Sequence, residues 1–361
     1  MMVLVNVIQS GAKKLGSIKW CWVLGCFIML FSACEHRELV EPTENVHYIR
    51  VYIDEQIKNV TCGFYRDSIV KPEYKRPMVL RAVLADPLSG KVVSERFLQT
   101  KGEDERGYYV EGYLNAPPGD YHLMVYNFAT ETILVRNEDD YYQMEGYTYP
   151  IPDYLKSGSM RSEVDGKGKS RAIHYEPDLL FLATEENIKI KESLQVDTLR
   201  TATGDHFMAR TSTKSYYLQI RVKGIEYVSS IVSTLTGMGE SVVLSTGMLG
   251  GNEEVGLYIP MHKGTFNASN ETVVYATFNT FGKLPNVSSF LQVDFDFVTV
   301  DGRSVAESID ITSLFETEQG RLNQWILIDK EIVIDPPPAS EDGGFQPSVG
   351  EWEQEDAEII I

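Results

Sequence analysis

Two aspartates close together in the sequence are the first residues whose type and spacing could support chemistry. Asp294 and Asp296 alternate with Val293, Phe295 and Phe297, so both carboxylates would project from one face of a strand. Such a pair could bind calcium or act as an acid–base pair. It could equally be the ordinary polar face of a strand whose apolar face is buried, and we favour this interpretation.

The histidines do not form a recognisable metal-binding or catalytic motif. They are His36, His47, His122, His174, His206 and His262, and no two have the spacing of zinc ligands. Gly168-Lys169-Ser170 ends like a phosphate-binding loop, but Glu163 stands where the first glycine is required. The dinucleotide fingerprint and the Gly-x-Ser-x-Gly elbow are also missing from the sequence. The sequence therefore predicts no enzyme, no metal site and no cofactor.

Tyrosines are concentrated between residues 139 and 156. Tyr141, Tyr142, Tyr147 and Tyr149 could form an aromatic platform for sugar rings, or they could cover one end of a sheet. The first alternative would make the protein a glycan-binding outer-membrane lipoprotein of a carbohydrate-uptake system. This is the second of our two functional hypotheses.

The first 33 residues predict a lipoprotein signal peptide. Three lysines precede Trp20–Ala33, an uncharged apolar run of 14 residues, which is shorter than the about 20 residues of a spanning helix. The run ends in Ala33-Cys34, which is similar to a bacterial lipobox. Cleavage between these residues would leave Cys34 as the acylated first residue, and residues 34–46 as a tether to the outer membrane. The alternative is a plain secretory peptide with an unrelated cysteine.

Charge and composition exclude other classes of protein. The chain has 33 Lys and Arg against 52 Asp and Glu, for a net charge of −19. Removal of residues 1–33, which carry three Lys and no acid, would leave −22. Such a chain is a poor electrostatic match to nucleic acid. Of the four cysteines, Cys62 alone would remain besides Cys34, so we expect no intrachain disulfide.

The elements that must position these residues are short β-strands. Ile49, Val51 and Ile53 alternate with Tyr48, Arg50 and Tyr52, and the same period of two recurs along the chain. Further alternating runs cover residues 121–126, 217–222, 291–297 and 326–334. Asp86–Gly90 separates two apolar runs as a hairpin turn would, because it contains both Pro and Gly. The best helix candidate, Ser304–Phe315, is short and is equally compatible with strand and loop.

We expect two β-sandwich domains within the mature chain. The first would cover residues 47–190 and the second residues 191–335, with a Pro-rich acidic tail at 336–361. The tail has seven acids and no base from Glu341 onward, which is typical of a solvated segment. It also contains apolar residues that suggest a strand pairing in cis or in trans; these are Phe345, Val349, Trp352, Ile359, Ile360 and Ile361.

The order of several motifs resembles the fimbrillin superfamily of Bacteroidales lipoproteins, particularly the minor or anchoring fimbrial subunits. The matching segments are the lipobox at Cys34, the strand His47–Asp54, the segment Ala116–Asn127, the segment Gly224–Gly239 with Leu244–Gly247, the strand around Asn279–Gly282, and the tail motif Gly343–Trp352.

The resemblance implies an all-β fold of two tandem transthyretin-like Greek-key β-sandwiches and assembly by strand donation between subunits. Our main hypothesis is a non-enzymatic outer-membrane lipoprotein, a fimbrial anchor or accessory subunit. Its partners would be the membrane, through the lipid on Cys34, and other fimbrial subunits.

Overall fold

The computed structural model describes residues 45–55, 75–128, 130–156, 172–193, 195–265, 271–284 and 291–338. Within them the chain forms strands throughout, with four short helical segments. The strands are β1 (Val46–Ile53), β2 (Val79–Ala85), β3 (Val92–Leu98), β4 (Thr100–Asp104), β5 (Gly107–Asn115), β6 (Gly119–Phe128), β7 (Ile133–Arg136), β8 (Glu145–Thr148), β9 (Ile173–Tyr175), β10 (Phe181–Ile190), β11 (Asp197–Thr198), β12 (Phe207–Thr211), β13 (Lys214–Lys223), β14 (Val228–Val243), β15 (Met248–Pro260), β16 (His262–Thr265), β17 (Thr272–Thr280), β18 (Gln292–Thr299), β19 (Ser304–Asp310) and β20 (Trp325–Val333). The helical segments are η1 (Asp153–Leu155), η2 (Ile225–Tyr227), α3 (Thr312–Glu316) and η3 (Gln319–Asn323).

The first sandwich is a nine-stranded sheet that folds over on itself. Its strand order is β3-β2-β6-β10-β12-β1-β5-β4, with β11 also paired to β1. The edge strands β3 and β4 are separated in the chain by Gln99 alone, so the chain passes there from one layer to the other. Alternate residues of both layers point inward and form one apolar core, to which β1 contributes Ile49 and Val51 and β6 contributes Leu123 and Val125.

The second sandwich packs a four-stranded sheet against a seven-stranded sheet. The order of the smaller sheet is β16-β17-β13-β20, and the larger contains β19-β18-β14-β15-β9 with β7 and β8. Leu218 and Ile220 of β13 meet Phe295 and Phe297 of β18 in the core between them. The prediction of an all-β fold built from two β-sandwiches is therefore confirmed.

Strand pairing crosses the predicted boundary between residues 190 and 191. β11 and β12 follow this boundary, yet both pair with β1 in the first sandwich. β8 and β9 precede it, yet β8 pairs with β14 and β9 pairs with β15 in the second sandwich. The chain thus enters the second sandwich after β6, returns to the first at β10, and leaves it again after β12.

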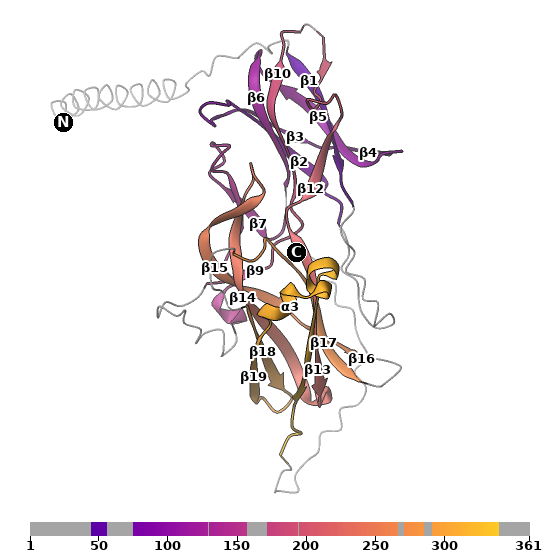
Figure 1. Ribbon diagram of the computed structural model, residues 1–361, viewed down its shortest axis with the longest axis vertical. Helices are drawn as coiled ribbons and strands as arrows, with labels where there is room; N and C mark the ends of the chain where they lie inside the picture. The colour runs from indigo at the N-terminus through magenta and orange to yellow at the C-terminus, as the bar shows by residue number, and fades with distance from the viewer. Residues whose placement is uncertain are drawn as a thin grey trace, which may run out of the picture.

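A separate apolar cluster lies where the two sandwiches meet. Val83 of β2 and Met124 of β6 point away from the core of the first sandwich and pack with Val242 of β14, Leu244 and Tyr141. In Figure 1, β1 to β6 lie at one end of the long axis and β13, β16, β18 and β19 at the other, with β7, β9 and β15 between them. The shared cluster joins the sandwiches through buried apolar surface, the main favourable term in packing.

The structure contains the predicted hairpin but only part of the helix candidate. The hairpin predicted around Asp86–Gly90 is formed, because β2 and β3 pair antiparallel on either side of it. The helix candidate Ser304–Phe315 divides into strand β19 and the short helix α3. The residues of β19 alternate between exposed and half-buried, which is the period of a strand.

Candidate functional site

Several of the predicted site residues lie outside the described residues. They are Ala33 and Cys34, at the predicted cleavage and lipidation site, and Phe345, Val349, Trp352, Ile359 and Ile361 of the predicted pairing segment. Lipidation of Cys34 and strand pairing by the tail remain predictions. In the described part of the chain, no helix is both long and apolar enough to cross a membrane.

The four tyrosines of the possible glycan platform have different neighbours. Tyr141 is 2% exposed and packs in the cluster between the sandwiches, so its ring has no face to offer a ligand. The Tyr142 hydroxyl donates to the carbonyl of Pro87 at 2.7 Å. The Tyr147 ring lies 5.0 Å from the guanidinium of Arg136, and the Tyr149 ring lies 5.0 Å from that of Tyr175. Tyr141 is therefore structural, and the other three stay a prediction.

The carboxylates of Asp294 and Asp296 lie on the face of β18 opposite Phe295 and Phe297, as expected from the alternation. Both are buried, and the Asp294 carboxylate accepts hydrogen bonds from the side chains of Gln292 and Ser308. Among the described residues, no group of three or more His, Cys, Asp or Glu side chains could hold a metal ion.

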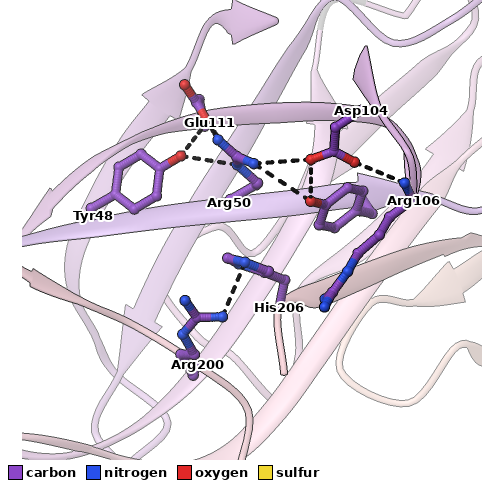
Figure 2. Close-up of polar contacts among 8 residues, drawn as sticks. Tyr48, Arg50, Asp104, Arg106, Glu111, Arg200 and His206 are labelled. Carbon is purple, nitrogen blue, oxygen red and sulfur yellow. Dashed lines mark hydrogen bonds and ion pairs between the residues drawn. The ribbon is translucent and has the colours of Figure 1, made fainter. Parts of the chain in front are cut away.

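A dense arrangement of polar and aromatic side chains lies instead on the outer face of β1 and β5. Because alternate residues of a strand point to opposite faces, burial of Ile49 and Val51 turns their neighbours outward. The antiparallel register places three outward pairs side by side; they are Tyr48 with Tyr113, Arg50 with Glu111, and Tyr52 with Tyr109. We call these six residues the Tyr–Arg face. Figure 2 shows Tyr48, Arg50 and Glu111 of this face with their neighbours Asp104 and His206.

Arg50 is at the centre of the Tyr–Arg face. Its Nε donates to Glu111 at 2.8 Å and its Nη1 to Asp104 of β4 at 3.1 Å, so the guanidinium joins β1 to both β5 and β4. The same guanidinium lies over the Tyr109 ring, 3.9 Å from its centroid. Arginine suits this position because its planar group can pair with carboxylates and stack on an aromatic ring at the same time.

Two tyrosine hydroxyls complete the network. Tyr48 donates to Glu111, and Tyr52 donates to Asp104 at 2.7 Å. Burial and the hydrogen bond to Glu111 raise the pKa of Tyr48 to about 12, so its hydroxyl keeps its proton at neutral pH. Both carboxylates are therefore already engaged by hydroxyl and guanidinium donors.

His206 closes one end of the Tyr–Arg face. Its ring packs edge-to-face on Tyr52 at 5.6 Å, and its Nε2 accepts a hydrogen bond from Nη1 of Arg200 at 3.0 Å. Figure 2 shows the side chains of Arg106 and Arg200 directed toward this imidazole from two sides. Burial and the guanidiniums of Arg200, Arg50 and Arg106 lower the pKa of His206, so the ring is neutral at pH 7.

The chemistry of this face favours binding over catalysis. The carboxylates of Glu111 and Asp104 are both paired with Arg50, whereas Arg106, Arg200 and Tyr113 are exposed. The residues of this face come from different strands, so they form no motif of fixed spacing that could be recognised in the sequence. One sequence signal could have identified this face. The outward positions of the alternating strand hold the large side chains Tyr48, Arg50 and Tyr52, although short polar residues would be sufficient at positions that face outward.

Comparisons with known proteins show similarity to a domain family and to a protein named as a fimbrial subunit. Residues 97–259 match the family model described as "Domain of unknown function (DUF5119)". Over 277 residues the chain is 24% identical to the "Putative fimbrium anchoring subunit Fim4B" of Bacteroides ovatus, covering 68% of this chain and 76% of that protein.

A solved structure shares the fold of this chain. A crystal structure of a "putative adhesin" from Bacteroides ovatus superposes with a TM-score of 0.52 at 20% identity, covering 81% of this chain and 93% of that one. The fimbrial anchor protein Mfa2 from Porphyromonas gingivalis is more distant, at a TM-score of 0.44 and 13% identity, with 80% and 90% coverage. The resemblance predicted from the order of the sequence motifs is confirmed: the chain is a relative of a fimbrium anchoring subunit of Bacteroides ovatus and has the fold of a Bacteroides adhesin.

Proposed function

We propose that the protein is a non-enzymatic surface lipoprotein that serves as a fimbrial anchor or accessory subunit. Acylated Cys34 holds it in the outer membrane, and it joins other fimbrial subunits by β-strand pairing. The observation that carries this proposal is the similarity over 76% of the length of a protein named as a fimbrium anchoring subunit.

The N-terminal sequence supports the anchoring part of the proposal. Basic residues, a 14-residue apolar run and Ala33-Cys34 follow one another as in a lipoprotein signal. Two or three acyl chains on one cysteine hold a protein to a bilayer far more firmly than one chain does. The −22 charge of the mature chain would keep its body away from an anionic membrane surface.

The topology of the second sandwich supports the strand-pairing part. In the four-stranded sheet, β16 and β20 occupy the two edges within the described residues. Edge strands offer backbone donors and acceptors to an added strand, and pockets for alternate side chains give specificity. β20 also leads directly toward the tail, which contains the apolar residues Phe345, Val349 and Trp352 among polar and small ones.

One experiment in the native host separates the two parts. We expect Cys34→Ala to release the protein from the outer membrane, and deletion of residues 343–361 to leave it anchored but absent from purified fimbriae. Membrane fractionation and immunogold labelling of fimbriae are the measurements, and Cys62→Ala is the control that keeps both properties. Unchanged anchoring of Cys34→Ala, or normal incorporation of the truncated chain, would contradict the corresponding part.

A further inference from the structure

The Tyr–Arg face is a surface that neither membrane anchoring nor strand pairing requires. β1 pairs with β12 on one side and β5 on the other, and β5 pairs with β1 and β4. The backbone groups at the centre of this face are thus already used, and an added strand has nothing to pair with there. Whatever binds must therefore be recognised by side chains.

One end of the face carries two exposed arginines in a strongly acidic protein. The side chains of Arg106 and Arg200 are exposed and lie on either side of the His206 imidazole, in a chain whose net charge is −19. Burial and these guanidiniums together lower the pKa of His206, which keeps the ring neutral. A planar guanidinium fork is suited to carboxylate or sulfate groups, with which it forms two parallel hydrogen bonds.

The remainder of the face carries aromatic rings. Tyr113 is 57% exposed and stands edge-to-face with Tyr48, their centroids 5.7 Å apart. The Arg50 guanidinium holds Tyr109 from one side, and a Cβ on Gly102 would come within 2.3 Å of the Tyr109 ring, so this ring is fixed in place. Rigid rings beside hydrogen-bonding groups are suited to a ligand with both apolar and hydroxyl-bearing faces.

We propose that the Tyr–Arg face, with Arg106, Arg200 and His206, binds an acidic saccharide. The carboxylate or sulfate of one sugar unit pairs with the exposed guanidiniums of Arg106 and Arg200 beside His206, and a neighbouring sugar ring stacks on Tyr113 and Tyr48. Hydroxyl groups of the saccharide exchange hydrogen bonds with the Arg50, Asp104 and Glu111 network. A saccharide fits better than an acidic peptide, because the backbone of β1 and β5 is already paired and the exposed surface is aromatic and polar.

This site is separate from the tyrosines at 141–149 and does not depend on the fimbrial proposal. The test uses the full chain in detergent and isothermal titration with three acidic oligosaccharides: sialyllactose, tetragalacturonate and a chondroitin sulfate tetrasaccharide. Lactose, methyl-esterified tetragalacturonate and unsulfated chondroitin are the matched probes with fewer charges, and a poly-glutamate peptide tests the competing ligand class. Comparison of the two carboxylate-bearing probes, sialyllactose and tetragalacturonate, with the chondroitin sulfate tetrasaccharide shows which acidic group the site recognises.

We expect binding of at least one acidic oligosaccharide, weakened by salt, with its matched probe bound more weakly. The double variant Arg106→Gln/Arg200→Gln should lower the affinity about tenfold or more, since each hydrogen bond to a charged group contributes a substantial fraction of such a change. Tyr113→Ala should weaken binding several-fold, whereas the exposed controls Arg96→Gln and Tyr154→Ala should leave it unchanged.

The variants replace exposed side chains, and urea unfolding checks that each one is folded. The proposal is overturned if none of the acidic oligosaccharides binds the unmodified chain, or if the charged and matched probes bind equally. Binding of poly-glutamate in preference to every saccharide would overturn it in favour of an acidic peptide. Affinity that the double arginine variant leaves unchanged would place the ligand elsewhere.

Discussion

At the scale of single residues, one carboxyl group stands out for its position between the two sandwiches. Glu176 follows β9 in the second sandwich and precedes β10 in the first. Its Oε2 accepts a hydrogen bond from the backbone N–H of Asn279 in β17 at 2.8 Å. Burial, with a contribution from the nearby Asp178 carboxylate, raises the pKa of Glu176 to about 7 despite that hydrogen bond. The folded protein therefore holds a proton there that the unfolded chain has lost.

This predicts a stability that falls as pH rises through the interval from 4.5 to about 7. Below that interval both states are protonated, and above it the folded state must carry a poorly solvated charge. Glu176→Gln should remove this dependence and raise the free energy of unfolding at pH 8 by up to about 3 kcal/mol. Urea unfolding between pH 4 and pH 8 measures it, with the exposed Glu131→Gln as control; parallel profiles for wild type and Glu176→Gln would contradict the assignment.

At the scale of elements, turns between strands depend on a few positions that require glycine. Gly224 ends β13 with a φ of +81°, and a Cβ built there would lie 2.1 Å from the carbonyl oxygen of Ile334, just after β20. This close approach accompanies the hydrogen bond from the Ile334 N–H to Lys223 at 2.9 Å, which closes the parallel β13–β20 pair. The turn and the strand pair are therefore coupled.

Gly224→Ala should destabilise the second sandwich by roughly 1 to 3 kcal/mol, through backbone strain and through displacement of the chain after β20. Gly204 provides a matched comparison, because its φ is +85° but nothing lies within 4 Å of its Cβ position. The denaturation midpoints of the two alanine variants measure the difference. If Gly204→Ala were as destabilising as Gly224→Ala, the contact with Ile334 would have no energetic role.

At the scale of the whole molecule, the two sandwiches share both strands and apolar surface. The chain crosses between them after β6, before β10 and after β12. Tyr141, Met124 and Val242 are buried together where they meet. An interface of this kind favours a single cooperative unfolding transition, because neither sandwich can lose its structure without exposing the other.

Tyr141→Ala should destabilise the protein by about 3 to 5 kcal/mol, the usual cost of truncating a fully buried aromatic ring. It should also separate one calorimetric transition into two, because the ring is part of the shared cluster rather than of either core. Tyr154→Ala, at a side chain that is 80% exposed, is the control for loss of a tyrosine. A single transition retained at lower temperature would mean that strand pairing alone couples the sandwiches.

The sequence by itself determined where many of the strands lie and which proteins the chain resembles. Period-two alternation at residues 49–53, 121–126 and 291–297 predicts strands because successive side chains of a strand point to opposite faces of the sheet. The hairpin at residues 86–90 was equally local, since Pro presets one backbone dihedral there and Gly90 allows the positive φ of +72°. Alternation also predicted that Asp294 and Asp296 share the face opposite Phe295 and Phe297. It did not predict that this face is buried or which side chains bond Asp294.

Only the tertiary structure decided which strands share a sheet and which side chains form a site. β1 lies between β5 and β12, although more than 150 residues separate β1 from β12 in the chain. Arg50, Asp104 and His206 come together because of that order, and no spacing along the sequence encodes it. The sequence left Tyr141 open between a ligand platform and the cover of a sheet end, and its partners in space bury it. Alternation specifies the face on which a side chain lies, but long-range pairing decides what that face meets.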